Sequence, residues 1–478
     1  MIEYILDGHG LANEVQTMIQ VFYPNTGYKP AENLSPAAVT VLSRIGEGFA
    51  YALVYDMGIL KSQKKVKIKN NSLAEKKRSM KLSIYGALSE ITGIRPPWGL
   101  LTGIRPAKIA NALLDEGKDA KYAVSFLRDI YLAEESKAGL AVNVAAAERE
   151  ILKGNTERDM SIYIGIPFCP SRCLYCSFTS YPLAKYEKSV DTYIDCVIKE
   201  LDTVSAYAED KLLKTVYIGG GTPTVLSERQ LERLIGALRD RFDFSGVLEF
   251  TVEGGRPETL TSEKLKTLKD GGVSRLSINP QTMNEKTLRL IGRNHSPDDI
   301  KEAFFMARQE GFFNINTDII LGLPGEGPAE VLHTLDEIRE LSPENLTVHT
   351  LAVKRASKLK EELGEYTLAG AKLMENMLDV SAKAAYSMGM SPYYMYRQKN
   401  SIGNFENVGY SKPGCFCMYN VLIMEETQNI IAAGAGAVSK TVDLKTGKIE
   451  RIFNVKSVDD YISRIDEMIE RKKRGLNI

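Results

Sequence analysis

Between residues 160 and 350, six short apolar runs alternate with amphipathic stretches, and this pattern limits the possible folds more than any other feature. The runs have the length of strands and are almost continuously apolar, as in strands buried on both faces. They are Ser161–Ile166, Thr215–Gly219, Val247–Val252, Arg275–Asn279, Asn314–Ile320 and Asn345–Thr350. Helical periodicity fills the stretches between them, near residues 186–206, 227–241, 261–270, 298–310 and 328–341. Six such units predict an α/β fold with a parallel sheet or barrel, whose chemistry lies at the carboxyl ends of the strands.

The rest of the chain forms one region before this pattern and one after it. Residues 1 to about 70 contain alternating stretches that predict strands, and residues 107–152 are rich in Ala, Leu and Glu and predict helices. The last region contains, in order, a helical stretch (358–388), an irregular Tyr-, Asn- and Gly-rich segment (393–420), a pair of strands and a charged closing helix (457–473). We therefore predict three domains: an N-terminal α+β domain (1–152), the barrel (158–354) and a C-terminal accessory region (355–478).

The composition predicts the setting of the protein. Its 478 residues include 61 Lys and Arg and 61 Asp and Glu, so the net charge is zero and nothing favours nucleic acid or a membrane surface as a partner. The first residues lack the features of a signal peptide, and no apolar run reaches the ~18 residues of a membrane span. Six cysteines are too few for a disulfide framework at this length. We expect a cytoplasmic protein.

Two features of the N-terminal region stand out. Nine basic residues and only one acidic residue, Glu75, lie between positions 61 and 81. This stretch is either a solvated hairpin and helix face or a docking patch for a polyanion or an acidic partner. The second feature is a repeat, since Thr92-Gly-Ile-Arg-Pro recurs as Thr102-Gly-Ile-Arg-Pro on either side of the only tryptophan, Trp98. Two copies predict two similar turns that cap helices, because Pro suits the first position of a helix.

Three cysteines follow the first strand with the spacing C-x3-C-x2-C, in Cys169-Pro-Ser-Arg-Cys173-Leu-Tyr-Cys176. Three thiolates on one loop can bind three irons of a cubane cluster and leave the fourth iron open to a small chelating molecule. Structural zinc is the alternative, but it requires a fourth Cys or His, and the next 18 residues contain none.

Polar and glycine residues occur at the ends of the following strands. The second strand ends in Gly219-Gly-Gly-Thr-Pro-Thr224, where glycines allow a ligand to approach the backbone. Glu249 and Glu253 are four residues apart on the third strand and so share a face. A carboxylate inside a barrel needs a donor, such as a ligand amine or hydroxyl. With Gln281, Arg293 and Asp318 at later strand ends, these residues predict a polar ring suited to a zwitterionic nucleoside.

The cysteine spacing resembles that of the radical S-adenosylmethionine superfamily, and the ordered motifs are similar to those of the oxygen-independent coproporphyrinogen III dehydrogenase family. The motifs are Tyr163-x-Gly-Ile-Pro-Phe-Cys, Gly-Gly-Gly-Thr-Pro-Thr, Thr-Val-Glu, Arg-Leu-Ser-x-x-x-Gln-Thr-Met, Gly-Arg-x-His and Asp-x-Ile-x-Gly-Leu-Pro. The resemblance covers roughly residues 160–440. It implies a partial (β/α)6 TIM-like barrel, one [4Fe–4S] cluster, and S-adenosylmethionine that is cleaved to a 5′-deoxyadenosyl radical.

The resemblance also assigns roles to individual residues. The cluster ligands are Cys169, Cys173 and Cys176. The residues that match contacts to the cluster-bound S-adenosylmethionine are Tyr163, Gly220, Glu253 and Val438. The residues that match contacts to a second S-adenosylmethionine are Tyr175, Gly221, Thr222, Gln281, Arg293, Asp318 and Ala352. Of all these, we predict Tyr163, Glu253 and Gln281 to be catalytic.

The reaction that the resemblance implies is oxidative decarboxylation of two propionates of coproporphyrinogen III to vinyl groups, which gives protoporphyrinogen IX in haem biosynthesis. We expect a tetrapyrrole substrate and an electron donor such as flavodoxin or ferredoxin, with no membrane and no nucleic acid. Because the substrate carries four carboxylates, Arg355, Arg397 and the basic stretch at 61–81 are candidates to hold it.

Two departures from the family pattern leave alternatives open. Family dehydrogenases have a fourth cysteine where this chain has Phe178, and a related haem-chaperone branch also lacks it. That branch carries a His-Asn pair, which is Tyr419-Asn420 here. A haem-binding chaperone without dehydrogenase activity is therefore the second hypothesis, and a radical enzyme acting on another tetrapyrrole or an RNA is the third. Cys415 and Cys417 serve either packing or an auxiliary metal, haem or redox role.

Overall fold

The computed structural model describes residues 1–24, 26–103, 105–354, 356–398 and 401–478. The chain divides into two compact units. Residues 1–146 and 397–405 form the N-terminal unit, and residues 147–396 and 406–478 form the barrel unit.

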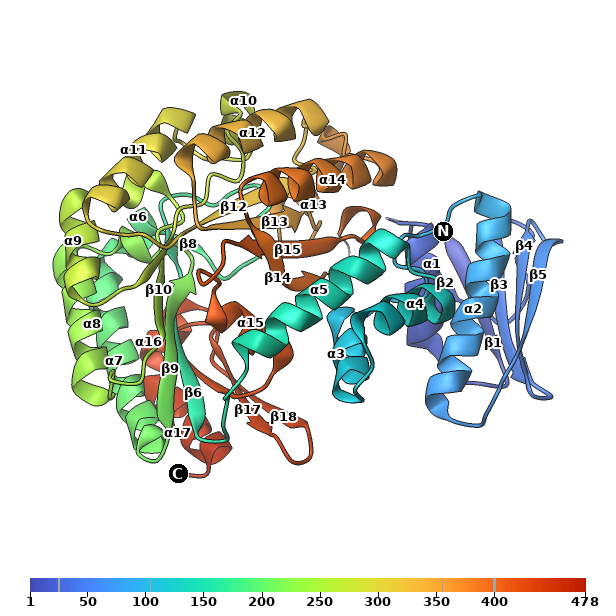
Figure 1. The fold of residues 1–478 in the computed structure, drawn as a ribbon, viewed down its shortest axis with the longest axis horizontal. Helices are drawn as coiled ribbons and strands as arrows, with labels where there is room; N and C mark the ends of the chain where they lie inside the picture. The colour runs from blue at the N-terminus through green and yellow to red at the C-terminus, as the bar shows by residue number, and fades with distance from the viewer. Residues whose placement is uncertain (25, 104, 355, 399–400) are drawn as a thin grey trace. The chain divides into compact units, whose positions relative to one another are not determined.

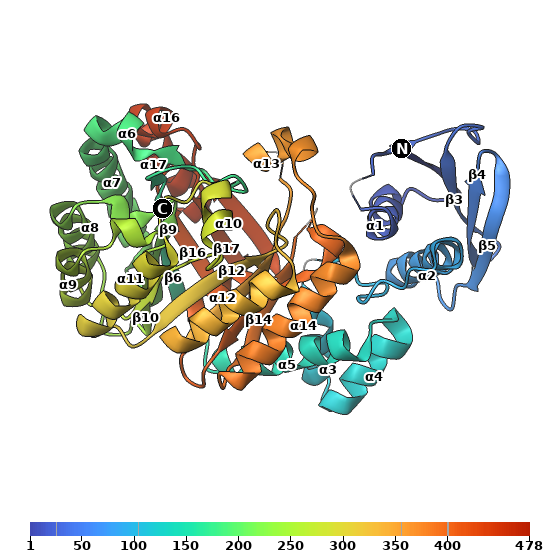
Figure 2. The same cartoon turned by 90° about the horizontal axis from the view of Figure 1, so that it is seen from above.

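The N-terminal unit begins with a sheet of strand order β2-β1-β3-β4-β5, which confirms the predicted strands. The strands are β1 (Ile2–Asp7), β2 (Tyr28–Pro30), β3 (Val39–Gly46), β4 (Phe49–Asp56) and β5 (Ile59–Lys67). Helices α1 (Ala12–Phe22) and α2 (Leu73–Thr92) pack against each other and against one face of this sheet (Figures 1 and 2). The apolar core between helices and sheet includes Val15, Val41, Val54 and Ile84.

The predicted helices of residues 107–152 are confirmed as α3 (Ala107–Asp115), α4 (Ala120–Tyr131) and α5 (Glu135–Ile151). Of the two repeat copies, the first ends a helix and the second precedes one. Gly93 follows α2 with φ +70°, a left-handed conformation that glycine adopts without strain. Pro106 is the residue before α3, where its missing N–H costs nothing.

The barrel unit contains the six predicted parallel strands in the spatial order β6-β9-β10-β11-β12-β13, which confirms the α/β prediction. They are β6 (Asp159–Ile166), β9 (Leu212–Gly220), β10 (Glu249–Glu253), β11 (Arg275–Ser277), β12 (Ile315–Leu321) and β13 (Asn345–Thr350). The helices that connect these strands lie on the outside of the curved sheet (Figure 1). They include α7 (Val190–Ala208), α8 (Glu228–Arg241), α9 (Ser262–Asp270), α10 (Glu285–Leu290), α11 (Pro297–Gln309) and α12 (Pro328–Leu341).

The sequence explains where these helices begin and what they cover. Ser227 starts α8 and Ser296 starts α11, each with a reciprocal capping box that satisfies free N–H groups of the first turn. On the sheet, Ile162 and Ile164 of β6 are fully buried and belong to the core that the helices cover. The continuous apolar strands predicted from the sequence are therefore buried, as parallel strands between two layers are.

The region after β13 differs from the prediction in three places. Residues 393–420 are not irregular, because they include β14 (Ser391–Arg397), β15 (Glu406–Ser411) and helix α15 (Met418–Glu425). The helical stretch 358–388 is interrupted, with α13 (Lys358–Glu361) separated from α14 (Ala371–Ser387). The closing helix is two helices, α16 (Val458–Ser463) and α17 (Ile465–Leu476). Tertiary pairing explains the first difference, since β15 runs antiparallel to β13 and takes its regularity from that neighbour.

The predicted pair of strands near the C-terminus is a set of three: β16 (Asn429–Ala433), β17 (Val438–Asp443) and β18 (Lys448–Phe453). Strand β16 is parallel to β6 and extends the parallel part of the sheet by one strand on the side opposite β9. Its carboxyl end therefore lies beside the carboxyl end of β6, where the cysteine loop begins. Among the described residues, no helix is both long and apolar enough to cross a membrane.

Candidate functional site

The three cysteines lie on a loop that leaves the carboxyl end of β6. Short strands β7 (Phe168–Cys169) and β8 (Tyr181–Pro182) pair at the base of this loop, so Cys169 is fixed at its start. Cys169 and Cys173 are buried and Cys176 is half-buried, and all three are free thiols. In the part of the chain that the structure describes, no three His, Cys, Asp or Glu side chains converge on a point that would hold a single ion.

Cys169 lies against the glycine-rich end of β9. A side chain at Gly221 would place its Cβ 2.5 Å from the Phe168 carbonyl oxygen and 3.0 Å from Cys169 Sγ, so only glycine fits. The Thr222 hydroxyl donates a hydrogen bond of 3.5 Å to Cys169 Sγ. Burial raises the pKa of the Cys169 thiol to about 11, although Thr222 opposes this shift. Gly221 and Thr222 thus lie beside the first cysteine.

Cys173 is surrounded by cations. Burial opposes ionisation of its thiol, but Arg293 and Arg256 outweigh burial, and the pKa of Cys173 lies below its ordinary value. The Arg256 guanidinium is 2% exposed and donates a 3.1 Å hydrogen bond to Cys173 Sγ. It also donates to the carbonyl and hydroxyl oxygens of Ser171 on the same loop. No sequence motif indicated Arg256, and its only signal was a charged residue in the Gly-Gly-Arg-Pro turn after β10.

Glu253 ends β10 and points to the end of β9. Its carboxylate accepts a 2.6 Å hydrogen bond from the Tyr217 hydroxyl and a 3.3 Å bond from the Gly220 backbone N–H. Burial raises the pKa of Glu253 to about 7, although the bond from Tyr217 lowers it. Tyr163 of β6 stacks on Tyr217 with ring centroids 6.0 Å apart, and burial also raises the pKa of Tyr163. The structure therefore brings Tyr163, Gly220 and Glu253 into one cluster.

Gln281 and Asp318 lie at the ends of two neighbouring strands. Gln281 has φ +68°, and a left-handed backbone at a side chain other than Gly or Asn is strained. Its buried Oε1 has no hydrogen-bond partner among the described residues. Its backbone N–H donates to the Asp318 carbonyl oxygen at 3.0 Å. Strain and a buried acceptor without a donor at one position are typical of a site that awaits a ligand.

The Asp318 carboxylate belongs to a polar chain inside the barrel. Asn316 donates to it at 2.8 Å, and the His349 ring nitrogen Nε2 lies 3.6 Å from it. Burial alone would raise the pKa of Asp318, but His349 and Asn316 hold it below its usual value. His349 at the end of β13 is therefore placed to orient an ionised Asp318.

Arg293 and Tyr175 complete the surroundings of Cys173. Arg293 is buried and donates to the carbonyl oxygens of Gly255 and Asn279, while its Nε has no partner among the described residues. Burial raises the pKa of Tyr175, which lies beside Cys173 and Arg293. The His295 ring lies 3.0 Å from the Glu258 carboxylate, which in turn lies 3.3 Å from the Arg256 guanidinium. His295 and Glu258 therefore help to fix the position of Arg256.

Ala352 and Val438 lie farther along the chain at half-buried positions. Ala352 follows β13 by two residues, and Val438 is the first residue of β17. The turn before Val438 contains Gly434 and Gly436, with φ +107° and +72°. A Cβ at Gly434 would lie 2.4 Å from the Gly165 carbonyl oxygen, so this turn packs directly on β6. Val438 itself lies opposite Phe453 in the pairing of β17 with β18.

The Glu249 carboxylate is occupied by hydrogen-bond donors of the protein itself. Its carboxylate accepts from the backbone N–H of Met418 at 2.7 Å and of Tyr419 at 3.3 Å, and from the Cys417 thiol at 3.3 Å. These are the first N–H groups of α15, where a carboxylate also benefits from the helix dipole. Glu249 therefore holds α15 inside the barrel and leaves Glu253 as the carboxylate of the polar ring.

Several further candidates have different surroundings. The Phe178 side chain is 72% exposed on the cysteine loop. Cys417 is buried against Glu249, and the Cys415 carbonyl oxygen accepts from Arg275 at 3.0 Å, which favours packing for this pair. Arg397 is buried, donates to two backbone carbonyls and lies over the Trp98 ring, so its guanidinium is already engaged. Arg355 lies outside the described residues.

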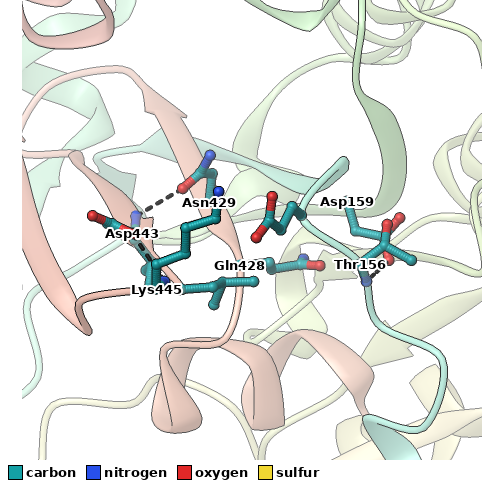
Figure 3. Close-up of a pocket in the computed structure, with 9 residues that line it drawn as sticks. Thr156, Asp159, Gln428, Asn429, Asp443 and Lys445 are labelled. Carbon is teal, nitrogen blue, oxygen red and sulfur yellow. Dashed lines mark hydrogen bonds between the residues drawn. The ribbon is translucent and has the colours of Figure 1, made fainter.

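A pocket of about 230 Å³ lies at the amino-terminal end of β6, whereas the cysteine loop follows its carboxyl end. Figure 3 shows residues that line this pocket. It is lined by residues at the beginnings of β6 and β16, among them Asp159, Gln428 and Asn429. Buried oxygen atoms of Asp159 and Gln428 have no hydrogen-bond partner within the described ranges. No sequence motif indicated these residues, and amino-terminal strand ends are where such folds place stabilising rather than reactive groups.

The residues at the carboxyl ends of the strands fit an iron–sulfur cluster with a nucleoside ligand. Three free thiols share one loop, and two buried arginines offset the negative charge that thiolates and a cluster would bring. Gly221 allows the end of β9 to pack directly on the first cysteine, because a Cβ there would collide with the Phe168 carbonyl oxygen and Cys169 Sγ. The unpartnered Oε1 of Gln281 is an acceptor for a ligand N–H or O–H.

Comparison with known proteins agrees with this fit. The radical SAM superfamily model matches residues 163–338. The oxygen-independent coproporphyrinogen-III oxidase-like protein HemZ of Bacillus subtilis (strain 168) is 40% identical over 392 residues, which are 80% of this chain and 78% of the relative. The heme chaperone HemW of Escherichia coli (strain K12) is 31% identical over 61% of this chain and 72% of its own length.

The fold also has a solved counterpart. The coproporphyrinogen III oxidase HemN from Escherichia coli, a radical SAM enzyme, aligns with a TM-score of 0.53 and 22% identity over 68% of this chain and 73% of that chain. This likeness supports the barrel and its extensions as a shared architecture. With the three cysteines, the strand-end motifs and the relative of 40% identity, the chain belongs to the radical SAM superfamily and, within it, to the oxygen-independent coproporphyrinogen III oxidase-like family.

Proposed function

We propose that this protein is an oxygen-independent coproporphyrinogen III dehydrogenase, which converts two propionate side chains of the substrate to vinyl groups. The observation that carries the proposal is the 40% identity, over 78% of its length, to a relative described as oxygen-independent coproporphyrinogen-III oxidase-like. We further propose a cytoplasmic setting and a small electron-transfer protein, flavodoxin or ferredoxin, as the reductant.

When bound, a [4Fe–4S] cluster and S-adenosylmethionine supply a carbon-centred radical able to take hydrogen from an unactivated propionate carbon. The chain's own residues hold and orient these groups. Cys169, Cys173 and Cys176 are the cluster ligands, and Arg256 offsets their negative charge. Glu253 is positioned to accept hydrogen bonds from ligand hydroxyl or amine groups, because Tyr217 and Gly220 fix its carboxylate.

The second S-adenosylmethionine would lie along Gln281, Arg293 and Asp318. The Gln281 Oε1 offers an acceptor, and Asp318, held ionised by His349 and Asn316, offers a negative charge for an ammonium or sulfonium group. The remaining residues of this proposed set are Tyr175, Gly221, Thr222 and Ala352, and those of the first set include Tyr163 and Val438.

The test is anaerobic turnover of the reconstituted protein with S-adenosylmethionine, a reductant and coproporphyrinogen III, followed by chromatography and mass spectrometry. We expect protoporphyrinogen and two carbon dioxide molecules per substrate. Cys173→Ala should abolish the product, whereas Cys415→Ala should leave it unchanged, because Cys415 is not on the cluster loop. Cleavage of S-adenosylmethionine without decarboxylation would refute the substrate while keeping the superfamily chemistry.

A haem chaperone is the second candidate, and Phe178 is the observation that favours it. The exposed Phe178 occupies the position of the fourth cysteine of the dehydrogenases that this chain resembles. A chaperone should bind haem stoichiometrically, as an absorbance titration would show, and should not decarboxylate coproporphyrinogen III.

A further inference from the structure

Within the described part of the N-terminal unit, helices cover only one face of the sheet. Helices α1 and α2 lie on the same side of the strands (Figures 1 and 2) and pack on β1, β3, β4 and β5. The covered side of β4 presents Ala50, Ala52 and Val54, all fully or almost fully buried. Its other side presents Phe49, Tyr51, Leu53 and Tyr55, which are half-buried. Strand β4 is thus apolar on both faces, like a strand between two layers, although helices cover only one.

Cations line this aromatic row on the neighbouring strand. The pairing of β4 with β5 places Lys67 opposite Phe49 and Lys65 opposite Tyr51. The Lys65 ammonium lies 3.9 Å from the centroid of the Phe49 ring and 5.3 Å from that of Tyr51. Lys69 continues the row beyond the end of β5. Lys65, Lys67 and Lys69 are exposed, and among the described residues no carboxylate lies within 4.0 Å of their ammonium groups.

Several other basic residues of the stretch from 61 to 81 are already paired. Lys64 binds Glu90 at 3.0 Å, Arg78 binds Glu75 at 2.8 Å, and the half-buried Lys81 donates to the Thr102 hydroxyl. Their charges stabilise the unit itself. Of the cations in this stretch that form no ion pair or side-chain hydrogen bond among the described residues, Lys65, Lys67 and Lys69 lie beside the aromatic row, and Lys61 and Lys76 are the others.

We propose that this face, defined by Phe49, Tyr51, Lys65, Lys67 and Lys69, binds single-stranded RNA. Aromatic side chains stack on bases of any sequence, and lysines that follow the chain contact successive phosphates. Alternate residues of a strand are about 6.8 Å apart, so the rings and the lysines both repeat along one direction, as bases and phosphates do.

The ring geometry favours a strand of nucleotides over one large flat ligand. The planes of Phe49 and Tyr51 are inclined by 50°, with centroids 6.2 Å apart. One rigid macrocycle cannot lie flat on both rings, whereas two bases of a flexible strand can each stack on their own ring. Lys65 would leave the Phe49 ring for a phosphate, which its flexible four-carbon stem allows. The zero net charge of the whole chain conceals this local concentration of positive charge.

The test is fluorescence anisotropy of a labelled 12-nucleotide single-stranded RNA titrated with the full-length protein between 50 and 200 mM salt. We expect binding that weakens with salt. Lys65→Gln/Lys67→Gln should reduce the slope of log affinity against log salt by about 1.4, because two phosphate contacts are lost. The matched control, Lys372→Gln/Lys383→Gln on α14, removes the same charge from exposed positions and should leave the slope unchanged.

The aromatic variant separates stacking from simple charge attraction. Phe49→Leu/Tyr51→Leu keeps the apolar character of the strand and should weaken RNA binding at least fivefold per ring at an unchanged salt slope. Wild-type affinity in this variant, equal binding of duplex and single-stranded RNA, or no RNA binding by the wild type at 50 mM salt would each overturn the proposal. Binding of an anionic porphyrin to this face in place of RNA would overturn it as well.

Discussion

The guanidinium of Arg256 donates a 3.1 Å hydrogen bond to Sγ of Cys173, although 83 residues separate them in the chain. Arg256 follows β10 and Cys173 follows β6, so the contact exists only because the carboxyl ends of these strands meet at one edge of the sheet. A buried cation at a cluster ligand favours added negative charge, and reduction of a cluster adds one negative charge.

Replacement of Arg256 by Gln should make the midpoint potential of the reconstituted cluster more negative. A loss of about 1.4 kcal/mol from one charge-assisted hydrogen bond corresponds to roughly 60 mV for one electron. Potentiometric titration followed by electron paramagnetic resonance measures this shift. Arg256→Lys should recover part of it, and the surface variant Arg241→Gln should leave the potential unchanged. An unaltered potential in Arg256→Gln would show that Arg293 alone sets the charge at this ligand.

Gly221→Ala should prevent normal cluster incorporation. The new Cβ would lie 2.5 Å from the Phe168 carbonyl oxygen and 3.0 Å from Cys169 Sγ, and both belong to the rigid base of the cysteine loop. We expect a several-fold loss of iron and sulfide per chain after anaerobic reconstitution. Gly236→Ala on α8 is the matched control, because a Cβ there meets nothing within 4 Å and should stabilise the helix by about 0.5–1 kcal/mol.

Glu249→Gln should destabilise the fold without a direct effect on ligand binding. The change removes the charge that holds the first N–H groups of α15 and leaves the buried Arg275 without a nearby anion. We expect a loss of about 1–3 kcal/mol in the free energy of unfolding, measured by urea denaturation. If stability were unchanged and S-adenosylmethionine binding lost, Glu249 would belong to the ligand site after all.

The sequence was sufficient for the parts of the fold that depend on local pattern. The strand from Asn345 to Thr350 has the predicted bounds, because its alternating apolar residues Leu346 and Val348 and its β-branched residues indicate a strand locally. The prediction that residues 393–420 are irregular was wrong, because β15 is regular only through its pairing with β13. The same holds for the site. The spacing of the cysteines is a local pattern and could be predicted from the sequence. The contacts of Arg256 with Cys173 and of Glu249 with α15 could not, because they join segments that are far apart in the chain.

The raised pKa of Glu253 predicts a specific dependence of stability on pH. The buried carboxyl has a pKa of about 7 in the folded protein and an ordinary value near 4.5 when unfolded. Between these values the folded state holds a proton that the unfolded state has lost, so stability decreases as pH rises from about 4.5 to 7. The full difference is roughly 3 kcal/mol.

Glu253→Gln should remove this contribution, because an amide does not titrate. Urea denaturation of the cluster-free protein at pH 5.5 and pH 7.5 should show a smaller difference in the free energy of unfolding for the variant than for the wild type. The surface variant Glu232→Gln serves as the control, since it should retain the wild-type dependence. An equal pH dependence in all three proteins would mean that Glu253 is ionised throughout this range.

Gln281→Gly should separate stability from function. The wild-type backbone has φ +68°, which glycine adopts without strain, so the variant gains relief of strain and loses backbone entropy in similar amounts. We expect its free energy of unfolding to stay within about 1 kcal/mol of the wild type. The side chain, however, carries the buried Oε1 that lacks a partner, so S-adenosylmethionine binding measured by calorimetry on the reconstituted protein should weaken about tenfold or more. Unchanged binding would show that the strained backbone at this position serves the fold and not the ligand.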